Sequence, residues 1–204
     1  MKEKPNPFVS ISDLMAGVTA VVMLLLVVMV VKMSVIKQAA DEEKRHGVRE
    51  TIRMIDKKLQ EANIESVSVK DSVITLKDHA FGRGSACLSP KVDSVLKMQI
   101  APILSEAMKD YGNIWVQFEG LTDAVDVRGV STNLEKKCAV FDDNYSLSAG
   151  RAREARKAML SMVQGDTAIS KRISVVGYGP DQLKNRLNPN AAENRRVEIR
   201  LVAR

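Results

Sequence analysis

Two kinds of hydrophobic pattern divide the chain. Residues 14–31 carry no charged side chain and almost no polar one, whereas the rest of the 204 residues mixes apolar and charged positions. As a helix this apolar run is about 27 Å long, close to the thickness of a bilayer's hydrocarbon core. A signal peptide is the alternative, but its apolar region is shorter and a small-residue cleavage site follows it, for which "KQAA" at 37–40 is the best candidate. The pattern therefore favours a retained transmembrane helix.

The charged segment at 36–62 has apolar residues at helical spacing, namely Val48, Ile52, Ile55 and Leu59. This spacing predicts a helical stalk or linker with a narrow apolar stripe. Such a stripe either pairs with a second copy of itself or packs against the domain that follows.

From about residue 64 the pattern alternates between strands and helices. Residues 67–76 alternate on both sides of a polar Lys-Asp-Ser turn, which predicts a hairpin. Pro102 is expected to kink or divide the first long helix. The predicted helices are 88–110 and 147–163, and the further predicted strands are 114–120, 172–179 and 196–202. We therefore expect an α/β fold, an α+β sandwich in which helices pack on one face of a single sheet.

The composition and the residue types argue against several classes of function. The net charge of +6 is spread along the chain and aromatic residues make up 4%, so we expect no direct binding of nucleic acid. Two histidines and the absence of a CxxC motif argue against zinc. Cys87 and Cys138 are buried thiols in a reducing compartment or a disulfide closing a long loop in an oxidising one. The sequence has no evident pairing of nucleophile and base, so neither an enzyme nor a cofactor is expected.

Separated blocks of the C-terminal part carry a family resemblance. "FEGLTDAV", "NYSLSAGRAREARKAML", "ISVVGYG" and "NAAENRRVEIRLV" resemble, in order, the blocks of OmpA-like peptidoglycan-binding domains, and "AFGRGSACLSP" is similar to that family's first strand-to-helix junction. The resemblance covers about residues 75–202. It implies an OmpA-like domain that binds the diaminopimelate of peptidoglycan stem peptides.

The resemblance also implies roles for individual residues. Asp123 would hold the ammonium group of diaminopimelate and Arg151 its carboxylate, because a guanidinium can fork onto a carboxylate. The alternatives are a turn cap for Asp123 and an ion pair on the surface of a helix for Arg151. The further residues that match the family pattern are Asn144 and Leu147, which would shape the groove, and Arg195 and Arg196, which would support the site.

Two features depart from the family pattern. Leu121 stands where the family usually has a histidine, and the stretch between Asp123 and Asn144 is longer than usual by roughly a dozen residues. In this fold, that insertion and the first strand-to-helix junction would both lie near the ligand end of the sheet. The resemblance thus leads to the hypothesis of a Cys87–Cys138 disulfide that pins the insertion.

Topology follows from the resemblance. Basic residues around the apolar run weakly favour an inside C-terminus by the positive-inside rule. A wall-binding domain, however, must lie outside the bacterial inner membrane. We therefore expect a cytoplasmic tail at 1–12, a transmembrane helix at 13–35, a linker at 36–63 and a periplasmic OmpA-like domain at 64–204.

Asp13 stands at the head of the apolar run. An acid at the centre of a membrane helix costs about 2.5–3.5 kcal/mol, and less near an end. On its own, this residue is explained as a helix N-cap at headgroup level. Joined to a wall-binding domain, the architecture resembles the B subunits of flagellar-type stators, in which such an aspartate carries ions. Residues 12–30, "SDLMAGVTAVVMLLLVVMV", are most similar to the B subunits of Zorya anti-phage defence motors.

That resemblance implies a partner set and a mechanism. A homodimer of this chain, held by peptidoglycan, would stand inside a pentamer of multi-span A subunits in a 5:2 complex that acts indirectly on cytoplasmic defence effectors. Asp13 would carry the ion, with Ser10, Ser12 and Thr19 as candidate hydroxyl ligands. We expect protons and leave sodium open. The alternatives are a flagellar-type stator B subunit and a passive anchor between envelope and wall, and a passive anchor has no need of Asp13.

Overall fold

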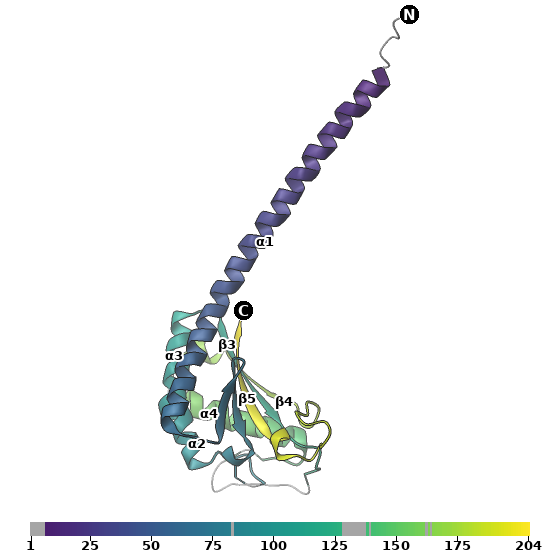
Figure 1. The fold of residues 1–204 in the computed structure, drawn as a ribbon. Helices are drawn as coiled ribbons and strands as arrows, with labels where there is room; N and C mark the ends of the chain where they lie inside the picture. Colours follow the sequence, from purple (N-terminus) through teal and green to yellow (C-terminus); the bar gives the residue numbers. More distant parts are fainter. Residues whose placement is uncertain (1–6, 83, 128–137, 139, 162, 164) are drawn as a thin grey trace, which may run out of the picture. The chain divides into compact units, whose positions relative to one another are not determined.

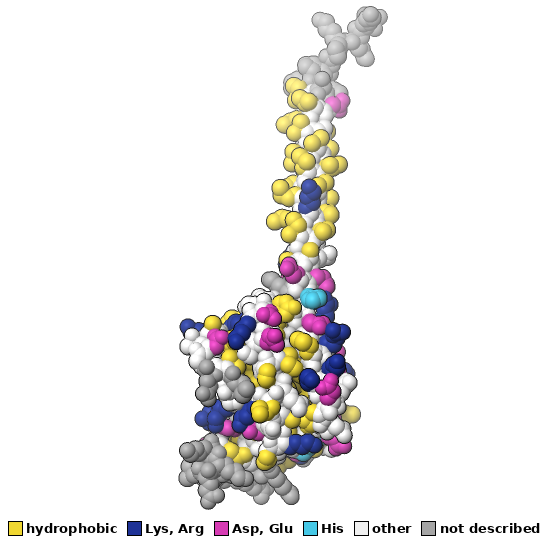
Figure 2. Space-filling view, turned by 90° about the vertical axis from the view of Figure 1, so that its left-hand side faces the viewer, with side chains coloured by type: hydrophobic (Ala, Val, Ile, Leu, Met, Phe, Trp, Pro, Cys, Tyr) yellow, Lys and Arg dark blue, Asp and Glu magenta, His cyan; other side chains and the backbone are white. Residues whose placement is uncertain are grey.

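The computed structural model describes residues 7–82, 84–127, 138, 140–161, 163 and 165–204, and the chain divides into two compact units, Met1–Glu43 and Lys44–Arg204. The described residues of the first unit belong to the helix α1 (Pro7–Ala62), which is long and apolar enough to cross a membrane. No part of its most apolar stretch is buried by protein, and hydrophobic side chains cover the face of this stretch seen in Figure 2. A surface of this kind requires lipid or partner helices around it.

The last turns of α1 belong to the second unit and contribute to its core. Val48, Ile55 and Leu59 are buried there, and Ile52 packs against the same core cluster. The buried Thr51 hydroxyl donates to the carbonyl of Gly47 at 2.7 Å, which satisfies it within the helix. In the structure the apolar stripe of the linker segment therefore packs against the domain.

Among the described residues, five strands form one sheet in the order β1-β2-β5-β3-β4. The strands are β1 (Val67–Lys70), β2 (Val73–Lys77), β3 (Ile114–Leu121), β4 (Ile173–Gly177) and β5 (Arg196–Ala203). The C-terminal strand β5 lies antiparallel between β2 and β3, and β4 pairs parallel with β3. The predicted hairpin is β1 and β2, whose turn residues Asp71 and Ser72 have positive φ angles of 51° and 64°.

Helices cover one face of this sheet (Figure 1). They are α2 (Pro90–Val95), the π-helix η2 (Leu96–Ile100), α3 (Ala101–Asp110) and α4 (Asn144–Leu160), with the short helices η1 (Asp78–Ala80), α5 (Thr167–Ser170) and η3 (Ala192–Asn194) in the connections. Alternate strand residues such as Leu76, Phe118 and Ile199 point into the core between the layers. The predicted fold class, an α/β sandwich with helices on one face, is confirmed.

Pro102 changes the winding of the long helical stretch at 90–110. The chain there remains helical, but a π-helical segment, Leu96–Ile100, directly precedes Ala101 and Pro102. Proline lacks an N–H, and its ring crowds the carbonyl four residues earlier, that of Met98. A wider π turn relieves this crowding without ending the helix.

The register of the sheet brings three separate segments to one edge. Arg196, the first residue of β5, pairs with Lys77 at the end of β2 and with Leu121 at the end of β3. Asp78 follows β2, Asp123 lies shortly after β3, and Arg195 precedes β5. These three residues are therefore expected at the same edge of the sheet.

Two glycines let α4 approach this sheet directly. A Cβ at Gly120 would overlap the carbonyl oxygen of Ser148, and one at Gly177 would lie 2.7 Å from the Cβ of Ala149. Because no side chain separates helix from strands, the first half of α4 lies close to the edge where β3 ends.

Candidate functional site

A cleft of about 710 Å³ opens at this edge of the sheet. Its size falls in the range of small-ligand sites. Among its lining residues are five of the six positions predicted to bind peptidoglycan, Asp123, Asn144, Leu147, Arg151 and Arg195. The residues come from the ends of strands β2 and β3, the start of β5 and the first half of α4.

Arg195 bridges two carboxylates in the cleft. Its Nη1 donates to Oδ2 of Asp123 at 2.5 Å and its Nη2 to Oδ2 of Asp78 at 2.9 Å. Asp123 is buried, with 6% of its surface exposed. The hydrogen bond to Asp78 and then that to Asp123 raise the pKa of the Arg195 guanidinium above its ordinary value. Arg195 is thus a fixed cation shared by the two acids, and the three groups together keep one net negative charge.

Arg151 is held differently. Its side chain is buried, its Nε donates to the carbonyl of Ser85 at 3.1 Å, and its guanidinium lies 5.2 Å from the centre of the Phe81 ring. Burial lowers the pKa of Arg151 from its ordinary value, and the Asp78 carboxylate opposes that effect. Nη1 lies 3.7 Å from Oδ1 of Asp78, beyond hydrogen-bond distance, and has no hydrogen-bond partner among the described residues.

Thr122 supplies a second unsatisfied group in the same cleft. Its Oγ1 is buried and, like Nη1 of Arg151, lacks a hydrogen-bond partner among the described residues. Buried polar groups are normally paired, because leaving one unpaired costs about 1–3 kcal/mol. Two unpaired groups lining one cleft indicate a place for a ligand that carries hydrogen-bond acceptors.

Asn144 and Leu147 shape the wall of the cleft. Asn144 Nδ2 donates to the carbonyl of Val125 at 2.9 Å, which ties the segment after Asp123 to the start of α4. Leu147 packs in a small apolar cluster with Ala86 and Phe141.

The structure separates Arg196 from this group. Its Nε donates to Glu198 at 2.7 Å, and its other nitrogens donate to the carbonyls of Asn194 and Gln182 at 3.2 and 3.3 Å. Neighbouring strand residues point to opposite faces of a sheet, so Arg195 and Arg196 differ in surroundings although they are adjacent.

A comparison with solved structures finds proteins of similar fold. A MotB-like protein from Desulfovibrio vulgaris matches with a TM-score of 0.54 and 24% identity, over 79% of this chain and 99% of that one. The fold is OmpA-like. Lower scores are found for the cell wall anchor of the T6SS from Pseudomonas aeruginosa (TM-score 0.48, 23% identity, 74% and 97% coverage) and the periplasmic domain of Helicobacter pylori MotB (0.45, 22%, 69% and 78%). No protein-family model matches the sequence, and no curated protein matches it significantly.

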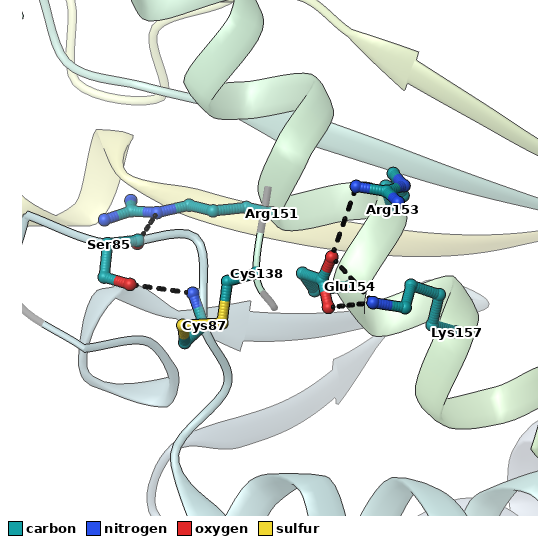
Figure 3. Close-up of a disulfide and its surroundings, with 7 residues drawn as sticks. All are labelled: Ser85, Cys87, Cys138, Arg151, Arg153, Glu154 and Lys157. Carbon is teal, nitrogen blue, oxygen red and sulfur yellow. Dashed lines mark hydrogen bonds and ion pairs between the residues drawn. A yellow bond between two sulfur atoms is a disulfide. The ribbon is translucent and has the colours of Figure 1, made fainter. Parts of the chain in front are cut away.

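Figure 3 shows a disulfide in the same part of the OmpA-like domain as Ser85 and Arg151. It joins Cys87 and Cys138, whose Cα atoms are 5.4 Å apart, and it is the pairing expected from the resemblance. The N–H of Cys87 donates to the Ser85 hydroxyl at 3.0 Å, and the carbonyl of Ser85 accepts from Arg151. The disulfide therefore fixes the loop that holds Arg151. Residues 128–137 and 139 of the stretch that holds the predicted insertion lie outside the described residues.

Sequence reasoning did not single out Asp78, Phe81, Ser85 or Thr122. Asp78 lies two residues beyond the predicted hairpin at 67–76, and Thr122 precedes Asp123, so strand ends were the available signal. Only the strand order, with β5 between β2 and β3, shows that these ends meet. Within the described part of the chain, no group of three or more His, Cys, Asp or Glu is placed to hold a metal ion.

In the first unit, Asp13 lies inside a helix. Because α1 begins at Pro7, Asp13 is in the second turn and does not occupy an N-cap position. The Thr19 hydroxyl donates to two carbonyls of its own preceding turn at 2.9 Å, and six residues of helix separate its direction from that of Asp13 by about 120°. Ser12 lies on α1 next to Asp13, and the side chain of Ser10 lies outside the described part of the chain. Within one copy, the helix therefore does not gather Thr19 with Asp13.

Proposed function

We propose that the OmpA-like domain binds peptidoglycan through the diaminopimelate of its stem peptides. The observation that carries this proposal is Nη1 of buried Arg151, which has no hydrogen-bond partner among the described residues and lies in a cleft that also holds the Asp123–Arg195–Asp78 bridge. Diaminopimelate presents an ammonium and a carboxylate on one carbon, so its recognition needs a cation and an anion side by side. The cleft supplies both.

Each group of the ligand has a partner in this arrangement. Arg151 donates to the carboxylate, which satisfies the open guanidinium nitrogen, and the Thr122 hydroxyl is a second donor. Arg195 engages Oδ2 of Asp123, and we assign the ligand ammonium to Oδ1. The amide of Asn144 keeps the loop after Asp123 in place for this contact.

The test is co-sedimentation of the full chain with purified sacculi. We expect Arg151→Ala to weaken binding about 10- to 100-fold, because a buried charge-assisted hydrogen bond contributes about 1.5–3 kcal/mol. Arg153→Ala is the matched control, since this arginine lies on the same helix with its side chain 58% exposed. Fluorescence of the single tryptophan, Trp115, verifies that each variant is folded. Wild-type binding by Arg151→Ala and by Asp123→Ala would remove the ligand assignment.

We further propose that the chain is the wall-anchored B subunit of an ion-driven motor in the inner membrane. Asp13 supports this role, because a titratable acid within an apolar helix, clear of its N-cap, is expensive and serves no purpose in a passive anchor. The chain would act as a homodimer inside a pentamer of multi-span A subunits, with its N-terminus cytoplasmic and its OmpA-like domain periplasmic. One proton carried across 100 mV releases about 2.3 kcal/mol, which would drive the ring around the anchored dimer.

Among such motors we assign the chain to Zorya anti-phage defence, with a flagellar-type stator as the alternative. The assignment rests on the similarity of residues 12–30 to Zorya B subunits. The neighbouring genes distinguish a defence motor from a flagellar-type stator. A multi-span partner beside a helicase or nuclease gene supports defence, whereas flagellar genes support motility and would overturn the assignment.

A further inference from the structure

A second cavity, of about 360 Å³, lies next to the cleft on the face of the sheet that the helices leave open. Its floor comes from three strands, because Ser68 pairs with Thr75 and Lys77 pairs with Arg196, and all four residues line it. Lys184 and the segment 192–193 complete the lining from the loop before β5. Nothing in the proposed contact with diaminopimelate uses this cavity.

The two cavities share one wall. Asp78, His79 and Arg195 line both of them, and the 2.9 Å ion pair between Arg195 and Asp78 lies within this wall. The wall is thus only one pair of side chains thick. A ligand group that sits against Arg195 in the cleft is therefore within one or two peptide residues, about 3.5–7 Å, of the second cavity.

The second cavity is lined by more basic than acidic side chains. Arg196 is paired with Glu198, whereas the Glu193 carboxylate accepts only from the neutral amide of Asn185 at 2.7 Å and keeps its negative charge. Lys77 and Lys184 are exposed, and neither forms an ion pair within the part of the chain that the structure describes. Because the two ammonium groups outnumber the Glu193 carboxylate at this cavity, the remaining positive charge favours an anionic ligand group.

We propose that this cavity is a second subsite of the wall-binding site and that it takes a second carboxylate of the same stem peptide. This inference rests on the proposed binding of diaminopimelate in the cleft. The stem peptide offers two such groups, the free α-carboxylate of the D-glutamate that precedes diaminopimelate and the carboxylate at the peptide's C-terminus. With one carboxylate at Arg151 and the other at Lys77 and Lys184, the ligand spans the Arg195–Asp78 wall.

Calorimetric titration of the full chain in detergent, with short synthetic stem peptides as probes, tests the subsite. The probes are the tripeptide L-alanyl-γ-D-glutamyl-diaminopimelate, the same tripeptide with the D-glutamate α-carboxylate amidated, and the tripeptide with its C-terminal carboxylate amidated. We expect the double variant Lys77→Gln/Lys184→Gln to bind the unmodified tripeptide about tenfold more weakly than the wild type. Lys70→Gln is the matched control, because Lys70 is exposed on the same sheet hairpin but does not line the cavity.

The amidated probes identify which carboxylate is bound. The correct amidation lowers wild-type affinity by a similar factor and abolishes the difference between wild type and double variant, since the group that the lysines contact is gone. If the double variant binds the unmodified tripeptide as tightly as the wild type while Arg151→Ala does not, the second subsite is wrong and the cleft assignment stands. If the wild type binds none of the probes, the proposed function itself fails.

Discussion

Arg151 and Arg195 line the same cleft, yet their surroundings give them different capacities. Arg195 is 29% exposed at its side chain and engages two carboxylates, so its charge is already compensated. Arg151 is 4% exposed and keeps one nitrogen without a hydrogen-bond partner among the described residues. We therefore expect a ligand carboxylate to gain more from Arg151 than from Arg195, which is bonded to Asp123. The sequence alone does not distinguish Arg151 from Arg195. The residues that surround each of them in the structure do.

The carboxylate of Asp143 stabilises α4, the helix that carries Arg151. As the N-cap of α4 it forms a capping box with Ser146, accepting from the Ser146 N–H at 2.6 Å. The hydrogen bond from the Ser146 hydroxyl, and then the one from its N–H, lowers the pKa of Asp143 from 3.8. A lowered carboxylate pKa stabilises the folded state above the unfolded pKa, and this stabilisation is lost as the pH falls through the folded value.

We therefore expect the urea midpoint of the wild type to fall between pH 6 and pH 3 by more than that of Asp143→Asn. Asparagine can still accept at the cap but does not titrate. Trp115 fluorescence of the full chain reports the midpoint. The control is Asp110→Asn, which removes an exposed carboxylate at the end of α3. Equal pH dependence in wild type and Asp143→Asn would contradict the role given to this cap.

At the scale of elements, residues 44–62 act as a core helix of the second unit. Ile55 is fully buried, whereas its neighbour Met54 is 41% exposed. We expect Ile55→Ala to lower the free energy of unfolding by about 2–5 kcal/mol, because a truncated core side chain leaves a cavity. Met54→Ala should change it by less than about 0.5 kcal/mol. Urea unfolding followed by Trp115 measures both, and equal effects would mean that this helix is a free stalk.

The sequence predicts the individual strands and helices better than it predicts how they are arranged in the fold. Strict alternation at 196–202 and the Lys-Asp-Ser turn at 70–72 each predict a local structure that the fold contains. Local patterns cannot show that β5 inserts between β2 and β3, because that order depends on contacts far apart in the chain. Asp78 was therefore missed although its strand was predicted. The π turn before Pro102 was missed because proline forbids a normal turn without specifying the replacement.

At the scale of the whole molecule, the two compact units differ in how their apolar side chains are covered. The first presents an apolar helix with no protein around it, and the second is a folded OmpA-like domain with its own core. A wall anchor requires no more than an apolar helix and a wall-binding cleft. Asp13 is the feature that exceeds this requirement, so the choice between anchor and motor depends on one side chain.

Asp13→Asn tests that choice, because it preserves the size of the side chain and removes its titration. We expect reconstituted complexes of this variant with the multi-span partner to lose ion-driven activity, measured as proton flux into vesicles under an imposed potential. Binding to sacculi should stay at the wild-type level, since the change lies in the first unit and the cleft in the second. Met15→Leu, an apolar change at an exposed position two residues away, is the control for insertion of the helix. If complexes of Asp13→Asn conduct as well as the wild type while still binding the wall, the ion does not pass by way of this chain's apolar helix, because no other acid lies within residues 14–31, and the chain serves only as an anchor.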